Sequence, residues 1–296
     1  MSVGATERPW ELAGAEGETI LGDAHRPVGE ARGTLLICHG FMGYKDYGLM
    51  PLLADAAAKR GWVAHRFNFS HSGMTHRLET FERDDLFARD TWRKQAIDLR
   101  TVLVALRSGE LDGGGRPVVV FGHSRGGVTA LLTTRWMLDE NDPALPDALV
   151  TAASPSASHR VTQEQAEALR EAGYLERKSG RTGQTLKIDR RWLDEQHDDP
   201  DWHAVLTAAG RVAVAELPWL ILHGSGDDTV PLADGEALLE ASGGRAELRV
   251  VDGASHTFDC PNPAPREVTT VNTRRLIEAT LAFAGEVRVR SVSAGD

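Results

Sequence analysis

Residues 118–127 read Val-Val-Val-Phe-Gly-His-Ser-Arg-Gly-Gly, and this stretch decides which fold the chain can adopt. Its apolar first part predicts a buried strand, and residues 127–138 continue with helical spacing. Between the two, Gly122 and Gly126 flank Ser124 in the pattern G-x-S-x-G. Glycine lets the backbone turn tightly. We therefore expect a sharp turn that presents the Ser124 hydroxyl at the helix N-terminus, where backbone N–H groups favour negative charge.

The same alternation of strand and helix extends over most of the chain. Buried strands are expected at residues 34–38, 62–67, 117–121, 148–152, 219–222 and 248–251. Helices are expected at residues 47–60, 88–107, 127–138 and 266–284, followed by a frayed tail to residue 296. Two weaker strands, at residues 18–25 and just before them, could add an antiparallel edge. The pattern predicts an α/β fold with a doubly wound, mostly parallel sheet.

One segment interrupts this alternation. Residues 155–215 contain polar helical stretches and a glycine-rich turn but no good buried strand. A structureless loop of this length would be unusual inside a compact domain. We therefore predict a helical cap at residues 155–215, inserted into a core made of residues 1–154 and 216–296.

The composition limits the kind of partner that the chain can bind. The 296 residues are 41% hydrophobic and 26% charged, which is enough to bury a sizeable core. The net charge of -10 argues against nucleic acid or an anionic membrane as a partner, because both require a basic face. The sequence shows no secretory leader, no membrane-spanning run and no disulfide framework. We expect a cytoplasmic protein that acts on a small molecule.

Candidate partners for Ser124 follow two later strands. A serine hydroxyl becomes a nucleophile when a histidine removes its proton and a carboxylate orients that histidine. His256 follows the strand at residues 248–251, and Asp227 and Asp228 follow the strand at residues 219–222. Ligand sites of such sheets lie at the carboxyl ends of the strands. We therefore expect Ser124, His256 and one aspartate to meet there, and the spacing favours Asp227 over Asp228.

Donors for a developing oxyanion are expected beside Ser124. His39-Gly40-Phe41 follows the strand at residues 34–38, and its glycine allows a turn next to the nucleophile. A tetrahedral intermediate needs hydrogen-bond donors aimed at its oxyanion. We assign this role to the backbone N–H groups of Phe41 and Arg125.

These residues together resemble the α/β-hydrolase superfamily over nearly the whole chain. Residues 223–231, His-Gly-Ser-Gly-Asp-Asp-Thr-Val-Pro, are similar to the acid loop of prolyl-oligopeptidase-like and dienelactone-hydrolase-like members, in which the acid falls on Asp227. Residues 67–73 resemble a strand and loop of cinnamoyl and feruloyl esterases. Those relatives commonly have aspartate and glycine where Asn68 and His71 stand, and often glutamine where Arg125 stands.

The resemblance implies a serine hydrolase of the carboxylesterase kind, which forms an acyl-enzyme on Ser124 and needs no cofactor. The same residues could serve a peptidase, an amidase, a thioesterase or a lactonase, because a triad does not by itself select the leaving group. A non-catalytic ligand-binding protein with this fold is the alternative from another class, although such proteins usually lack a member of the triad.

In the same family, an insertion after the sixth strand is a cap that shapes the substrate pocket. This makes Trp192, Trp202 and Leu206 candidate pocket residues, and the alternative is that they form a small core of the cap itself. The stretch from His197 to His203 is also rich in aspartate and histidine. It has no recognised metal-ligand spacing, so we interpret it as a solvated acidic turn and expect no metal.

Overall fold

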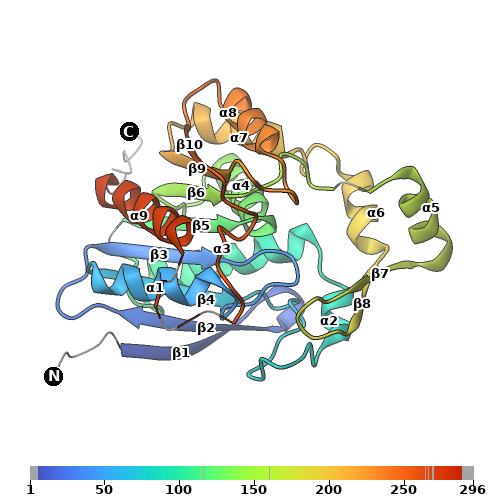
Figure 1. Cartoon of the computed structure of the whole chain (residues 1–296), viewed down its shortest axis with the longest axis horizontal. Coiled ribbons are helices and arrows are strands. Elements are labelled where there is room, and N and C mark those ends of the chain that lie inside the picture. The colour runs from blue at the N-terminus through green and yellow to red at the C-terminus, as the bar shows by residue number, and fades with distance from the viewer. Residues whose placement is uncertain are drawn as a thin grey trace.

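The computed structural model describes residues 6–115, 117–159, 161–263, 265, 267–268 and 270–288 (Figure 1). Within these residues, eight strands form one sheet in the order β1-β2-β4-β3-β5-β6-β9-β10. The strands are β1 (Thr6–Ala13), β2 (Thr19–Arg26), β3 (Gly33–Cys38), β4 (Trp62–Asn68), β5 (Val118–His123), β6 (Ala148–Ala152), β9 (Trp219–Gly224) and β10 (Glu247–Val251). The pairings of β1 with β2 and of β2 with β4 are antiparallel, and the remaining pairings are parallel.

Helices cover both faces of this sheet. The helices are α1 (Leu49–Lys59), α3 (Trp92–Ser108), α4 (Arg125–Asp139), α7 (Val205–Val214), α8 (Leu232–Ala241) and α9 (Val271–Glu286), with the short α2 (Asp84–Ala88) and η1 (Ala15–Gly17). Alternate residues of β5 show the two layers: Val118 and Val120 pack with α3 and α4, whereas Val119 and Phe121 pack with α1 and α9. Strand β5 is therefore buried on both faces, which explains its unbroken apolar run.

The structure confirms the predicted fold class. Each of the six predicted strands is present, and the weaker prediction of an antiparallel edge corresponds to β1 and β2. Five of the six are buried, whereas β10 is an edge strand in which only Val251 is buried, so the prediction of burial is wrong there. Helix α3 begins later than predicted because Thr91 caps it, its side chain accepting a hydrogen bond from the backbone N–H of Lys94. Thr270 caps α9 in the same way, so α9 begins at Val271, later than the predicted start at residue 266, and it ends at Glu286, two residues beyond the predicted end. Residues 289–296 of the predicted tail lie outside the described residues, as does residue 266. Helix α8 was not predicted.

The segment 155–215 contains a β-hairpin in addition to the predicted helices. It comprises α5 (Gln163–Ala172), β7 (Tyr174–Lys178), β8 (Thr185–Asp189), α6 (Arg191–Asp198) and α7. The elements from α5 to α6 project beyond the sheet (Figure 1). Strands β7 and β8 are only partly buried, so their residues lack the apolar run that marked the core strands. Helix α7 packs against α4 and α8, so it lies on the core, and this favours a cap that ends before α7. The cap boundary at residue 215 stays a prediction.

Candidate active site

Ser124 stands at the turn between β5 and α4 in a backbone conformation that side chains rarely adopt. Its φ is 53° and its ψ is -121°. The two glycines of the motif allow this turn. A Cβ on Gly122 would lie 2.4 Å from the carbonyl oxygen of Gly126, and a Cβ on Gly126 would lie 2.5 Å from that of Cys38. Neither position has room for a side chain, so the packing at this turn requires the two glycines of the pattern G-x-S-x-G.

The structure brings Ser124, His256 and Asp227 together from the ends of three strands. His256 Nε2 lies 3.1 Å from Ser124 Oγ. His256 Nδ1 lies 2.8 Å from Asp227 Oδ2. This is the arrangement in which the imidazole can take a proton from the hydroxyl while the carboxylate holds its tautomer.

Asp227 is fixed by its own loop. Its side chain is fully buried, and Oδ1 accepts hydrogen bonds from the backbone N–H groups of Thr229, at 2.9 Å, and Val230, at 2.8 Å. Burial by itself raises the pKa of Asp227, but these bonds and the one from His256 outweigh it and hold the pKa below its ordinary value. The neighbouring Asp228 accepts a hydrogen bond from the Thr229 hydroxyl at 3.3 Å. Only the carboxylate of Asp227 is thus placed against His256.

His123 is a further contact of the site that the sequence analysis did not assign. His123 Nε2 lies 2.8 Å from the backbone oxygen of His256, and the two imidazole rings lie 5.0 Å apart. Burial lowers the pKa of His123 to about 4, so its ring is neutral at pH 7 and its Nε2–H can donate to that oxygen. The bond ties the loop that carries His256 to the end of β5. In the sequence, His123 is only the variable residue of the motif, so its partner could not be predicted.

The loop after β3 passes close to the nucleophile. A Cβ on Gly40 would lie 3.1 Å from the Cβ of Ser124, so the backbone of Gly40 comes close to the nucleophile. Arg125 is the first residue of α4 and lies on the other side of the turn. The assignment of the Phe41 and Arg125 N–H groups as oxyanion donors stays a prediction, and this geometry is compatible with it.

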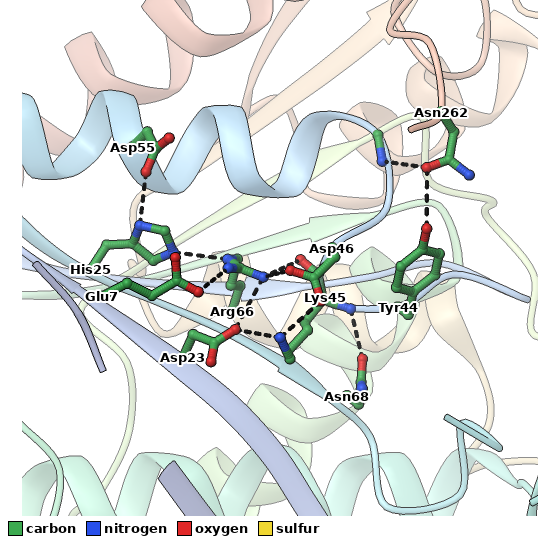
Figure 2. A network of polar contacts seen from close by, with 11 residues as sticks. Glu7, Asp23, His25, Tyr44, Lys45, Asp46, Asp55, Arg66, Asn68 and Asn262 are labelled. Carbon is green, nitrogen blue, oxygen red and sulfur yellow. Dashed lines mark hydrogen bonds and ion pairs between the residues drawn. The ribbon is translucent and has the colours of Figure 1, made fainter. Parts of the chain in front are cut away.

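A buried ionic network anchors the same loop (Figure 2). Arg66, on β4, forms ion pairs with Asp46 in the loop, with Asp23 on β2 at 3.2 Å and with Glu7 on β1 at 2.6 Å. Lys45 forms ion pairs with Asp23 and Asp46. The loop that runs past Ser124 is therefore held by charges from three strands of the antiparallel edge.

Hydrogen bonds complete this attachment at both ends of the loop (Figure 2). The backbone N–H of Lys45 donates to Asn68 at the end of β4, at 2.7 Å. The backbone N–H of Gly48 and the Tyr44 hydroxyl both donate to the side chain of Asn262, at 3.2 Å and 3.4 Å. Asn68 thus has a structural role, since its side chain holds the backbone of the loop at Lys45.

A cavity of about 250 Å³ opens beside Ser124. Residues of the cap form much of its wall, and Phe41 and Trp92 come from the core. Of the three predicted pocket residues, Trp192 lines this cavity, whereas Trp202 and Leu206 are not among its described lining residues. Trp202 packs under the guanidinium of Arg93 at 4.5 Å, and Leu206 is 45% exposed on α7. These two residues thus lie away from this cavity, and their role in a substrate pocket stays a prediction.

The acidic turn is held by contacts within the protein. Asp199 forms an ion pair with Arg93, and its backbone oxygen lies 2.7 Å from His203 Nδ1. His203 Nε2 lies 3.3 Å from Glu195. In the part of the chain that the structure describes, no group of three or more histidine, cysteine, aspartate or glutamate residues is placed to hold a metal ion. Among the same residues, no helix has the length and apolar character needed to span a membrane.

Comparison with known proteins places the chain in a family. Residues 35–271 match the model of the alpha/beta hydrolase family, and the chain belongs to it. The resemblance predicted from the sequence is thereby confirmed at the level of the family. None of the curated protein sequences compared with the chain matches it.

Solved structures with the same fold include several esterases and hydrolases. The esterase domain of a Rhodothermus marinus protein is 18% identical, with a TM-score of 0.62 over 95% of this chain and 99% of that one. Est1E from Butyrivibrio proteoclasticus is 17% identical, with a TM-score of 0.63 over 93% of this chain and 96% of that one. Dienelactone hydrolase from Anabaena variabilis is 18% identical, with a TM-score of 0.63 over 96% and 99%. At these identities the likeness establishes the fold alone.

Proposed function

We propose that the chain is a serine hydrolase of carboxylic esters, with Ser124 as nucleophile, His256 as general base and acid, and Asp227 as the carboxylate that orients His256. The observation that carries the proposal is the unbroken chain of contacts from Ser124 Oγ to His256, at 3.1 Å, and from His256 to Asp227, at 2.8 Å. Esterases and hydrolases among the solved structures of this fold support the choice of reaction.

In the first half of the reaction, Ser124 Oγ attacks the carbonyl carbon of the ester as His256 Nε2 takes its proton. The carbonyl π electrons move to the oxygen, and the N–H groups of Phe41 and Arg125 stabilise the oxyanion. Asp227 stabilises the imidazolium that forms. The intermediate collapses when the bond to the alcohol oxygen breaks and His256 returns the proton to that oxygen. The products of this half are the free alcohol and an acyl-enzyme on Ser124.

In the second half, water replaces the alcohol. His256 removes a proton from the water as its oxygen attacks the acyl carbon, and a second tetrahedral intermediate forms in the same place. Its collapse releases the carboxylic acid and returns the proton to Ser124. The neutral state of the neighbouring His123 favours this cycle, because no second positive charge stands beside the imidazolium.

The test is the hydrolysis of short 4-nitrophenyl esters together with labelling by a fluorophosphonate probe. Ser124→Ala should abolish labelling and lower kcat by more than about 10⁴-fold, since the nucleophile and base act as a unit. Ser108→Ala, at the end of α3, is the matched control and should keep both activities. A Ser124→Ala protein that hydrolyses the esters at the wild-type rate contradicts the mechanism. Thioester and amide substrates of the same acyl group then report which leaving groups the site accepts.

A further inference from the structure

The cavity beside Ser124 lies on the acyl side of the proposed reaction. The leaving alcohol must reach His256 Nε2 to receive its proton. The described lining of the 250 Å³ cavity includes Ser124, Arg125 and Trp92 but not His256. A group bound in this cavity is therefore the part of the substrate that remains on Ser124, which is the acyl group.

The charged residues that line this acyl cavity are all basic. Arg125 and Arg177 line it, and its described lining contains no aspartate or glutamate. The remaining wall is largely apolar. This contrast is unexpected in a chain with a net charge of -10. The cavity that adjoins the nucleophile is thus lined by two arginines, of which Arg125 also forms an ion pair with Asp90.

A second cavity has the opposite character. It measures about 1250 Å³, and the carboxylates of Asp46, Asp55 and Glu79 line it beside a single arginine, Arg181. Phe41 lines both cavities and so stands at their boundary. The described lining of this cavity thus holds three carboxylates and one arginine, whereas that of the acyl cavity holds two arginines and no carboxylate.

Arg125 has donors that the protein leaves unused. The residue is only 8% exposed, and Nε and Nη2 make no hydrogen bond to a described residue. Nη2 lies 3.0 Å from Asp90 Oδ2 as an ion pair, without hydrogen-bond geometry. The guanidinium lies 4.6 Å from the ring of Trp92, which forms one wall of the cavity. Both nitrogens are covered by protein atoms, so any contact of Arg125 with a ligand falls to the part of its side chain that lines the cavity.

Arg177 and Trp192 add further donors from the cap. Arg177 Nη1 donates to the backbone oxygen of Glu176 at 2.9 Å, and among the described residues no carboxylate pairs with Arg177. The indole Nε1 of Trp192 is buried and makes no hydrogen bond to a described residue. Both side chains line the acyl cavity. The core and the cap therefore each place one arginine, Arg125 and Arg177, in the wall of the same cavity.

We propose that the acyl cavity binds an acyl group that ends in a carboxylate, and that Arg125 and Arg177 hold this carboxylate. The inference rests on the proposed function and adds the substrate class, a monoester of a dicarboxylic acid. Arginine binds carboxylates with charge-assisted hydrogen bonds, which are stronger than neutral ones. A cavity of 250 Å³ corresponds to roughly eight water molecules at liquid density, which suits a chain of about six carbons.

The test compares two esters that differ only at the end of the acyl chain. One is the mono-4-nitrophenyl ester of adipic acid, and the other is 4-nitrophenyl 5-carbamoylpentanoate, a neutral compound of the same size. The wild-type protein should hydrolyse the anionic ester with a kcat/KM roughly 10- to 100-fold higher, the range expected for a hydrogen bond to a charged group. A ratio near one overturns the inference while the hydrolysis of both esters leaves the proposed function intact.

Variants of the cap locate the source of this preference. Arg177→Gln removes one positive charge from the cavity and should lower the ratio between the two esters at least about threefold. Lys178→Gln is the matched control, because Lys178 is the next residue of β7 and is exposed. It removes the same charge from the opposite face of the strand and should leave the ratio unchanged. Equal ratios in the wild-type and Arg177→Gln proteins overturn the role of Arg177.

A binding measurement separates this inference from the proposed reaction. Titration calorimetry of the wild-type protein with adipate and with adipamide needs no turnover. Tighter binding of adipate, weakened by Arg177→Gln and not by Lys178→Gln, supports carboxylate recognition even in a protein that hydrolyses neither ester. Equal binding of the two compounds overturns it. Failure of Ser124 to react with a fluorophosphonate, in contrast, bears on the proposed function alone.

Discussion

Replacing Ser124 with glycine should make the protein more stable than replacing it with alanine. Both changes remove the hydroxyl and its contact with His256. They differ in the Cβ, which alanine has and glycine lacks. A residue with a Cβ is strained at the φ of 53° and the ψ of -121° found at position 124. Residues in such conformations carry about 1–3 kcal/mol of strain. Glycine adopts the conformation freely but costs about 0.5–1 kcal/mol of additional chain entropy on folding.

The net difference is about 1 kcal/mol in favour of Ser124→Gly. In a domain of this size, this corresponds to a rise in Tm of about 2 °C relative to Ser124→Ala. Differential scanning calorimetry of the two variants at pH 7 measures it directly, and both variants should be inactive on esters. A Ser124→Ala protein that is as stable as Ser124→Gly, or more stable, would refute the reasoning, because it would show that the turn stores no strain in its Cβ.

Three other changes test separate parts of the site and the fold. Asp227→Asn should lower kcat by about 10³- to 10⁴-fold because the amide cannot stabilise the imidazolium, whereas Asp228→Asn should change it little in the same ester assay. His123→Phe removes the donor to the backbone oxygen of His256 and should cost about 1–3 kcal/mol of unfolding free energy, with a larger effect on kcat than on KM. Burial raises the pKa of Asp98 to about 7, so the folded chain retains a proton there that the unfolded chain releases near pH 4. Stability should therefore fall between about pH 4 and pH 7, and Asp98→Asn should flatten that dependence in thermal denaturation curves.

The residues around Ser124 could be predicted because each constraint there is local. The apolar run of β5, the two glycines and the start of α4 are consecutive in sequence and together define the turn. His256 and Asp227 lie far from it in sequence, but both follow buried strands, and the edge of a parallel sheet brings such positions together. The choice between Asp227 and Asp228 was harder, because adjacent side chains point in different directions and the sequence does not show which one faces His256.

The cap could be predicted only as a segment. Strands β7 and β8 alternate buried and exposed residues weakly, because they form a two-stranded sheet against few neighbours. In the sequence, Trp202 and Trp192 are equally good candidates for a pocket residue, because aromatic side chains line pockets and also pack in protein cores. The ion pair between Arg125 and Asp90 joins residues that are distant in sequence and share no motif. Contacts of this kind depend on tertiary packing, which no local pattern encodes.

The ionic network of the antiparallel edge limits how far the chain could be shortened. Arg66 lies on β4, which pairs antiparallel with β2 and parallel with β3, and its side chain is only 4% exposed. Two of its carboxylate partners, Glu7 and Asp23, lie on β1 and β2. An engineer seeking a minimal catalyst would regard these first strands as expendable, since no proposed catalytic residue lies on them. Their deletion would remove two of the three carboxylates that pair with Arg66 and would turn β4 into an edge strand. The first two strands thus supply carboxylates to the ionic network that holds the loop beside Ser124.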